Sequence, residues 1–262
     1  MSLNHITYYD SVLYFFTEPY IGSIAEEMLK IIDLDAPLSE PFSDNKSWSS
    51  FLGANGWVIS PYIKISKGIH PWYWAAKRNR HDLIERFFID KDGKIIKSIF
   101  GYIAENISVN KYVRFYEAVK CYLANHFTPC VMVLISLFEG CIRECPIPMW
   151  RYKITNFYKE AVSNELVAKD KLNAKFTGQI MLKNNLHSMY LPSLDSFITR
   201  LFCNPDHKFE NGNEPPYLNR NWLMHGMMKR NVTKRECIQM FNALFTLLYA
   251  TTYLVQNSPY DN

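Results

Sequence analysis

Apolar residues recur at helical spacing along most of the chain, and polar or proline-containing stretches separate the apolar segments. Between residues 94 and 145 the polar connections are short, which makes successive helices antiparallel neighbours. The pattern therefore predicts a mainly α protein, built as an up-and-down helical bundle. The predicted helices cover residues 11–32, 72–89, 94–106, 111–125, 128–145, 150–162, 191–202 and 217–226. Residues 233–236 (TKRE) predict a capping box that opens a long, apolar last helix.

A polar turn at residues 90–93 (DKDG) divides the chain into two predicted parts. Residues 1–93 are expected to form a mostly helical accessory region, and residues 94–262 the bundle. In the first part, Pro71 stands where a helix could begin. Residues 56–61 (GWVISP) are β-prone and predict a short extended segment, either a strand or a plug.

The predicted helix 128–145 is apolar on nearly all sides, so we expect it at the centre of the bundle. Thr128 is its expected N-cap, with Pro129 at the first helical position. Glu139 lies within the apolar run, and a buried carboxylate is costly unless it is paired. Arg143, one turn further on, is a local partner for it.

Composition excludes several classes of function. The net charge of +4 tolerates a polyanionic partner without requiring one. Cys141 and Cys145 share a helix face, but no further pair completes a zinc site, so we expect reduced thiols in a cytoplasmic protein and no metal. No glycine-rich phosphate loop supports nucleotide hydrolysis, and no cofactor is expected. The N-terminus lacks the basic region and cleavage site of a signal peptide.

Residues 237–257 carry no charge and are nearly long enough to span a bilayer. Polar residues interrupt this stretch, among them Gln239, Asn242 and Thr246. A buried helix in the bundle or at a dimer interface explains the pattern better than membrane insertion. A helical scaffold with a lipid-embedded last helix remains the alternative.

The candidate catalytic residues lie in residues 220–226 (RNWLMHG), on a predicted short helix that ends at a glycine. A metal-free ribonuclease needs a proton carrier and a cation for the phosphate, roles suited to histidine and arginine. Asn221 and His225 are four residues apart and share a helix face, which Arg220 borders. Trp222 and Leu223 point away and would anchor the helix. The alternative is structural, because Arg-x4-His also arises by chance and Arg220 could simply pair with Glu139.

The segment LNRNWLMHGM resembles the signature of HEPN domains, helical bundles whose ribonuclease members carry Arg, a polar residue, three variable residues and His. The helix VLISLFEGCIRE resembles the family helix that packs against that signature, and GWVIS resembles a segment found upstream in bacterial defence proteins. The likeness covers roughly residues 94–256. It implies catalytic roles for Arg220, Asn221 and His225, with Glu139 in support, and a dimer with one composite cleft. It also implies attack by the ribose 2′-OH without a metal.

We therefore expect a homodimeric, metal-independent endoribonuclease with an RNA substrate, acting as a toxin or anti-phage abortive-infection effector. An antitoxin or other regulatory partner is compatible with that role. One helix offers only one histidine, and a symmetric dimer would supply the second acid or base. The alternative is a HEPN-like module that binds RNA or protein without cutting.

Basic residues elsewhere offer weaker hints of RNA contact. Residues 77–81 (KRNRH) follow an aromatic cluster and are either an RNA-contact strip or, more commonly, a solvated helix face. The pairs Lys229/Arg230 and Lys234/Arg235 flank the candidate site and could guide an RNA backbone, although such positions are also ordinary places for exposed charge.

Overall fold

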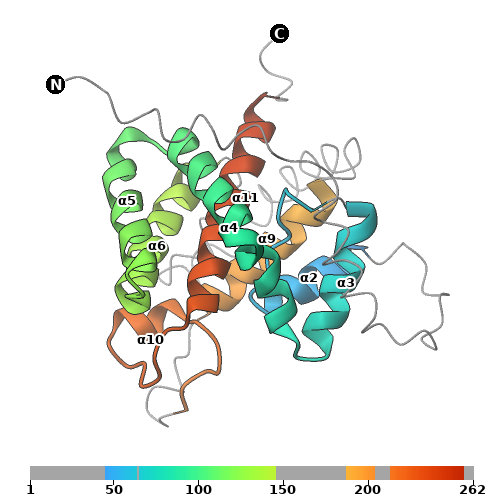
Figure 1. Cartoon of the computed structure of the whole chain (residues 1–262), viewed down its shortest axis with the longest axis horizontal. Helices are drawn as coiled ribbons and strands as arrows, with labels where there is room; N and C mark the ends of the chain where they lie inside the picture. The colour runs from blue at the N-terminus through green and yellow to red at the C-terminus, as the bar shows by residue number, and fades with distance from the viewer. Residues whose placement is uncertain (1–44, 64, 146–186, 204–212, 257–262) are drawn as a thin grey trace, which may run out of the picture.

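The computed structural model describes residues 45–63, 65–145, 187–203 and 213–256. This part of the chain is mainly α-helical and contains no β-strand, which confirms the predicted fold class (Figure 1). The predicted helices 11–32 and 150–162 lie outside it. The helices are α2 (Asn45–Ala54), α3 (Ile65–Lys77), α4 (His81–Asn106), α5 (Val109–Leu123), α6 (Phe127–Glu144), α9 (His187–Phe202), α10 (Arg220–Met224) and α11 (Lys234–Gln256).

The central helix is α11, which contacts α4, α6 and α9 (Figure 1). The expectation that residues 128–145 would take this place is wrong. Helix α6 keeps one stripe at the surface, where Thr128, Met132 and Ser136 follow one another at four-residue spacing. Its start is also earlier than expected, since His126 is the N-cap residue and makes no side-chain capping bond.

Residues 57–60 form a buried extended plug rather than a strand. The side chains of Trp57, Val58 and Ile59 are fully buried. Asn242 Nδ2 donates to the Val58 carbonyl at 2.7 Å, and Thr246 Oγ1 donates to the Ile59 carbonyl at 3.2 Å. These two residues of α11 therefore satisfy backbone groups that a neighbouring strand would otherwise bind.

Gln239, Asn242 and Thr246, which interrupt the apolar stretch, are thus part of the core. No helix within the described ranges combines the length and the hydropathy needed to cross a membrane.

The predicted helix 72–89 is two helices. Helix α3 starts at Ile65 and runs through Pro71, so the expected start at that proline is wrong. It ends before Asn79, whose φ of 58° is incompatible with a continuing helix. The expected turn at 90–93 is confirmed as a non-helical kink inside α4. Buried residues on both sides of this kink belong to one hydrophobic cluster, and the division into two domains at residue 93 stays a prediction.

Candidate functional site

Helix α10 lies at one end of the α5–α6 pair and contacts α6 and α9 (Figure 1). Its N-cap is Asn219, a buried residue that the sequence analysis did not single out. Asn219 Oδ1 accepts from the backbone N–H groups of Asn221 and Trp222 at 3.0 Å and 3.2 Å. Its Nδ2 donates to the Cys203 carbonyl at 3.2 Å. One asparagine thus both caps α10 and ties it to the end of α9.

The inner side of α10 is anchored as expected. The side chains of Trp222 and Leu223 are 1% and 7% exposed. At the far end the Met227 N–H donates to the Trp222 carbonyl and the Gly226 N–H to the Leu223 carbonyl, which is a Schellman motif. Gly226 has the positive φ of 68° that this motif requires, so the expected glycine stop is confirmed. A five-residue helix is therefore fixed at both ends.

Arg220 and Glu139 form an ion pair between α10 and α6. Arg220 Nη2 lies 3.7 Å from Glu139 Oε2, and the two side chains are 30% and 19% exposed. Glu139 also accepts from Arg143 Nη2 at 2.8 Å, so both of its anticipated partners are present. The carboxylate is half-buried rather than enclosed, because it lies where α6 meets α10 near the surface.

Asn221 is buried beside Arg220 and orients it. Asn221 Oδ1 accepts from Arg220 Nη1 at 3.1 Å, while Asn221 Nδ2 donates to the Cys203 carbonyl at 3.5 Å. Asn221 and His225 are linked through the main chain, where the His225 N–H donates to the Asn221 carbonyl at 3.1 Å. The amide side chain thus holds the guanidinium.

His225 is the C-cap of α10, and its imidazole is exposed to solvent. Arg220, Asn221 and Glu139 are joined by side-chain contacts, and His225 stands one helical turn away at the open end. Met224 and Met227 beside it are 40% and 42% exposed. The site therefore presents a histidine, an arginine and two apolar side chains from one short helix and the residues that follow it.

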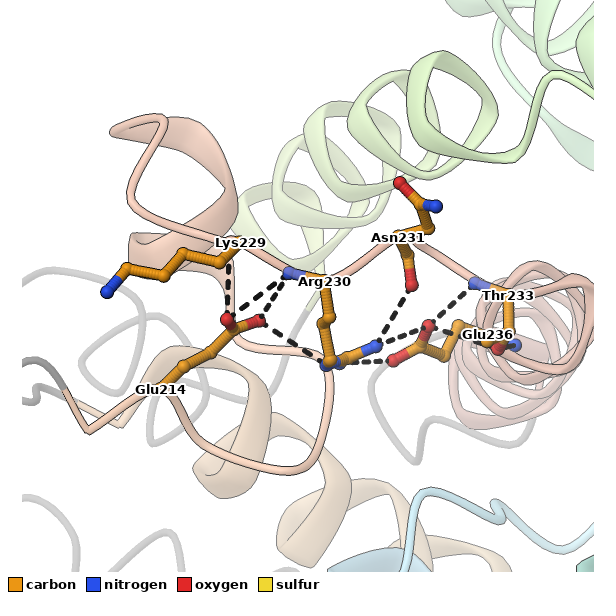
Figure 2. A network of polar contacts seen from close by, with 6 residues as sticks. All are labelled: Glu214, Lys229, Arg230, Asn231, Thr233 and Glu236. Atoms are coloured by element: carbon orange, nitrogen blue, oxygen red, sulfur yellow. Dashed lines mark hydrogen bonds and ion pairs between the residues drawn. The ribbon is translucent and has the colours of Figure 1, made fainter.

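The loop from α10 to α11 is held by Arg230, whose polar contacts Figure 2 shows. Arg230 Nη2 and Nη1 donate to the Glu236 carboxylate at 2.6 Å and 3.1 Å. Glu214 accepts from the backbone N–H of Lys229 at 2.9 Å and pairs with Arg230 Nε at 3.5 Å. Glu236 accepts from the Thr233 N–H at 2.9 Å and donates its own N–H to Thr233 Oγ1, which confirms the predicted capping box.

This network changes how the flanking cations are interpreted. Arg230 is enclosed by Glu214 and Glu236, and Arg235 pairs with Glu85 at 3.2 Å. In the pairs Lys229/Arg230 and Lys234/Arg235, the exposed cation is therefore the lysine. Glu214 lies in a loop, and nothing in the spacing of residues 213–216 indicated that it would bind Arg230.

Comparisons with protein-family models, with curated proteins and with solved structures find no match. Within the ranges that the structure describes, no group of three or more His, Cys, Asp or Glu side chains could hold a metal ion. All six cysteines are free thiols.

Proposed function

We propose that the protein is an endoribonuclease of the HEPN type, whose site is built on Arg220, Asn221 and His225. The observation that carries the proposal is the Arg220 guanidinium. It is partly exposed on one side and is held on the other by Glu139 and Asn221, with an exposed histidine one turn away. A fixed, accessible guanidinium with an imidazole one helical turn away offers a cation for the phosphate and a proton carrier, the two groups that metal-free phosphodiester cleavage requires.

In this mechanism His225 removes the proton of a ribose 2′-OH. The 2′-oxygen then forms a bond to the adjacent phosphorus, and the bond from phosphorus to the leaving 5′-oxygen breaks. Arg220 stabilises the negative charge on the phosphate oxygens as it builds up. A second acid donates a proton to the 5′-oxygen, which leaves a 2′,3′-cyclic phosphate and a 5′-hydroxyl.

A second copy of the chain supplies that acid as its own His225. The exposed Met224 and Met227 next to the histidine favour such a partner, because they offer apolar surface around the site. We therefore propose a homodimer in which two α10 helices share one cleft. A monomeric mass in solution at micromolar concentration would contradict this arrangement.

The six free cysteines support a reducing compartment, and we place the enzyme in the cytoplasm. The role as toxin or anti-phage effector, with an antitoxin or another regulator, is supported by the resemblance of LNRNWLMHGM to the family signature.

The test is cleavage of a single-stranded RNA pool in EDTA by the purified full chain, with the fragment ends identified by mass. Wild type should give cyclic phosphate ends. His225→Ala and Arg220→Ala should lower the rate at least a hundredfold while circular dichroism stays unchanged. Arg114→Ala on the exposed side of α5 is the matched control and should cut like wild type.

A second function is favoured by one observation. Arg220 is already engaged by Glu139 and Asn221, as a purely structural or RNA-holding arginine would be. A non-catalytic binding module would retain RNA in EDTA without producing fragments, and Arg220→Ala would weaken that binding. Such a result would contradict the endoribonuclease proposal and support a non-catalytic RNA-binding module.

A further inference from the structure

Glu139 is shared by two arginines that lie at unequal distances from it. Its Oε1 accepts from Arg143 Nη2 at 2.8 Å, which is a hydrogen bond. Its Oε2 lies 3.7 Å from Arg220 Nη2, which is beyond hydrogen-bonding distance. The closer partner is therefore Arg143, on the next turn of α6, which the proposed mechanism does not use.

The contact between Arg220 and Glu139 differs from that of a structural arginine in the same chain. Arg230 is bound by both oxygens of Glu236, at 2.6 Å from Nη2 and 3.1 Å from Nη1. Arg220 has the single long contact with Glu139, and its Nη1 donates to the neutral amide oxygen of Asn221 at 3.1 Å. Two-point binding by a carboxylate fixes and neutralises a guanidinium. Arg220 is thus directed by its partners without being neutralised at close range.

Arg143, Glu139 and Arg220 together carry one net positive charge. The neighbouring charges of α5 and α6 at this place cancel, because Lys111 pairs with Glu144. The attraction for a phosphate at Arg220 therefore depends on which arginine binds the carboxylate. While Arg143 holds Glu139, the charge of Arg220 is left for a ligand.

Loss of Arg143 should shift the carboxylate towards Arg220. The Glu139 side chain is only 19% exposed, and a carboxylate that is partly removed from water needs a cationic partner. Once released from Arg143, it would pair with Arg220 at hydrogen-bonding distance and cancel the charge that the phosphate needs. Arg143 itself can change without disturbing the core, since its side chain is 53% exposed.

We propose that Arg143 is a positioning residue of the site. It holds Glu139 and thereby keeps the Arg220 guanidinium available for a phosphate of the RNA. Arg143 acts through Glu139 and does not itself contact the reacting phosphate. The assignment rests on the proposed ribonuclease function, which supplies the identity of the ligand.

The test is a double-mutant cycle in RNA binding. The full chain in the non-cutting His225→Ala background is titrated with a fluorescein-labelled single-stranded RNA at several salt concentrations. Arg143→Gln should weaken binding about fivefold, the scale of one partly exposed ion pair. It should also lower the slope of log affinity against log salt by up to about 0.7, the value for one phosphate contact to a single strand. In a protein that also carries Glu139→Gln, the same Arg143→Gln change should alter the affinity less than about twofold.

Two control variants accompany the cycle. Arg143→Lys should bind like wild type, because a lysine four residues after a glutamate also pairs with it on a helix. Arg114→Gln removes an exposed positive charge from α5 and should weaken binding less than Arg143→Gln, to the same extent with and without Glu139→Gln. Equal weakening by Arg143→Gln in both Glu139 backgrounds would mean that Arg143 touches the RNA directly. That result, or no weakening in either background, would overturn the proposal.

The outcomes separate this assignment from the proposed enzyme. In the cutting protein, Arg143→Gln should raise KM several-fold and change kcat less, since it removes binding of the phosphate rather than the proton carrier. If wild type binds RNA without cutting it and the cycle holds, the role of Arg143 stands and the ribonuclease is wrong. If wild type cuts through His225 but the cycle is additive, the ribonuclease stands and the role of Arg143 is wrong. If the His225→Ala protein binds no RNA at any salt concentration, the role of Arg143 is wrong whatever wild type cuts.

Discussion

The Glu139 carboxylate of α6 lies 3.7 Å from the Arg220 guanidinium of α10, and the same carboxylate binds Arg143 at 2.8 Å. One acidic side chain thus connects two helices that are more than seventy residues apart in the sequence. Because both partners are partly exposed, the pair contributes little to stability, of the order of 1 kcal/mol or less. Its main effect is to fix the direction of Arg220.

Glu139→Gln should therefore lower RNA cleavage about tenfold while leaving the free energy of unfolding within about 1 kcal/mol of wild type. Glu144→Gln is the matched control, since Glu144 ends the same helix and pairs with Lys111 away from Arg220. Cleavage rates and urea unfolding of both variants check this. Equal activity of wild type and Glu139→Gln would show that the pair has no part in positioning Arg220.

Asn219→Ala should destabilise the fold by about 2 kcal/mol, because it removes a cap that accepts two N–H groups and leaves buried backbone groups without a partner. Urea unfolding measures the change. Ser108→Ala provides the comparison, since Ser108 occupies the N-cap of α5 but makes no side-chain capping bond. If both alanine variants lose the same stability, the capping contacts of Asn219 are not the cause.

Gly226→Ala should cost about 1 kcal/mol through backbone strain alone. An added Cβ at Gly226 would meet no atom within 4 Å, but the φ of 68° disfavours any residue with a side chain. At Gly101 in α4 an added Cβ also meets nothing, and the backbone is helical. Gly101→Ala should therefore stabilise by about 0.5–1 kcal/mol. A lower melting temperature for Gly226→Ala and a higher one for Gly101→Ala would show that backbone strain, and not packing of the added methyl group, causes the loss at Gly226.

Local patterns predicted the local features of this fold. Thr233 and Glu236 are three residues apart and form the expected capping box, and Gly226 ends α10 as its position after the last apolar residue indicated. The contacts of Glu139 were also foreseen, because a carboxylate in an apolar run needs a cation and the sequence offered only a few. These inferences need only residues close together in the sequence, or the requirement that one buried carboxylate has a cationic partner.

Features that depend on distant segments were not predictable in the same way. Asn242 binds the carbonyl of Val58 across 184 positions of sequence, so its polar side chain looked like an interruption of an apolar helix. The surface stripe of α6 at Met132 and Ser136 exists because α11 takes the centre, which periodicity alone does not decide.

The hydrogen bond between Trp57 and His81 should make the stability of the fold depend on pH. Trp57 Nε1 donates to His81 Nδ1 at 2.9 Å, so the bond requires this nitrogen of His81 to be unprotonated. Burial, and then the charges of Arg235 and Arg200, lower the pKa of His81 below its ordinary value of 6.5. Above pH 6.5 the imidazole is neutral in both folded and unfolded chains, and its titration contributes nothing. Below pH 6.5 the unfolded chain takes up the proton first. The free energy of unfolding therefore decreases as the pH is lowered, until His81 of the folded protein is also protonated.

Urea unfolding of wild type and His81→Gln at several pH values between 7.5 and 5 should isolate the loss of stability that His81 causes on acidification. The glutamine variant should be less stable at pH 7.5 and should lose less stability on acidification. The imidazole is only partly buried, and solvent screening keeps the wild-type slope from His81 well below about 1.4 kcal/mol per pH unit, the limit for one proton. His126→Gln replaces an exposed histidine and should keep the wild-type slope. Parallel pH profiles for wild type and His81→Gln would mean that the Trp57–His81 bond does not couple folding to protonation.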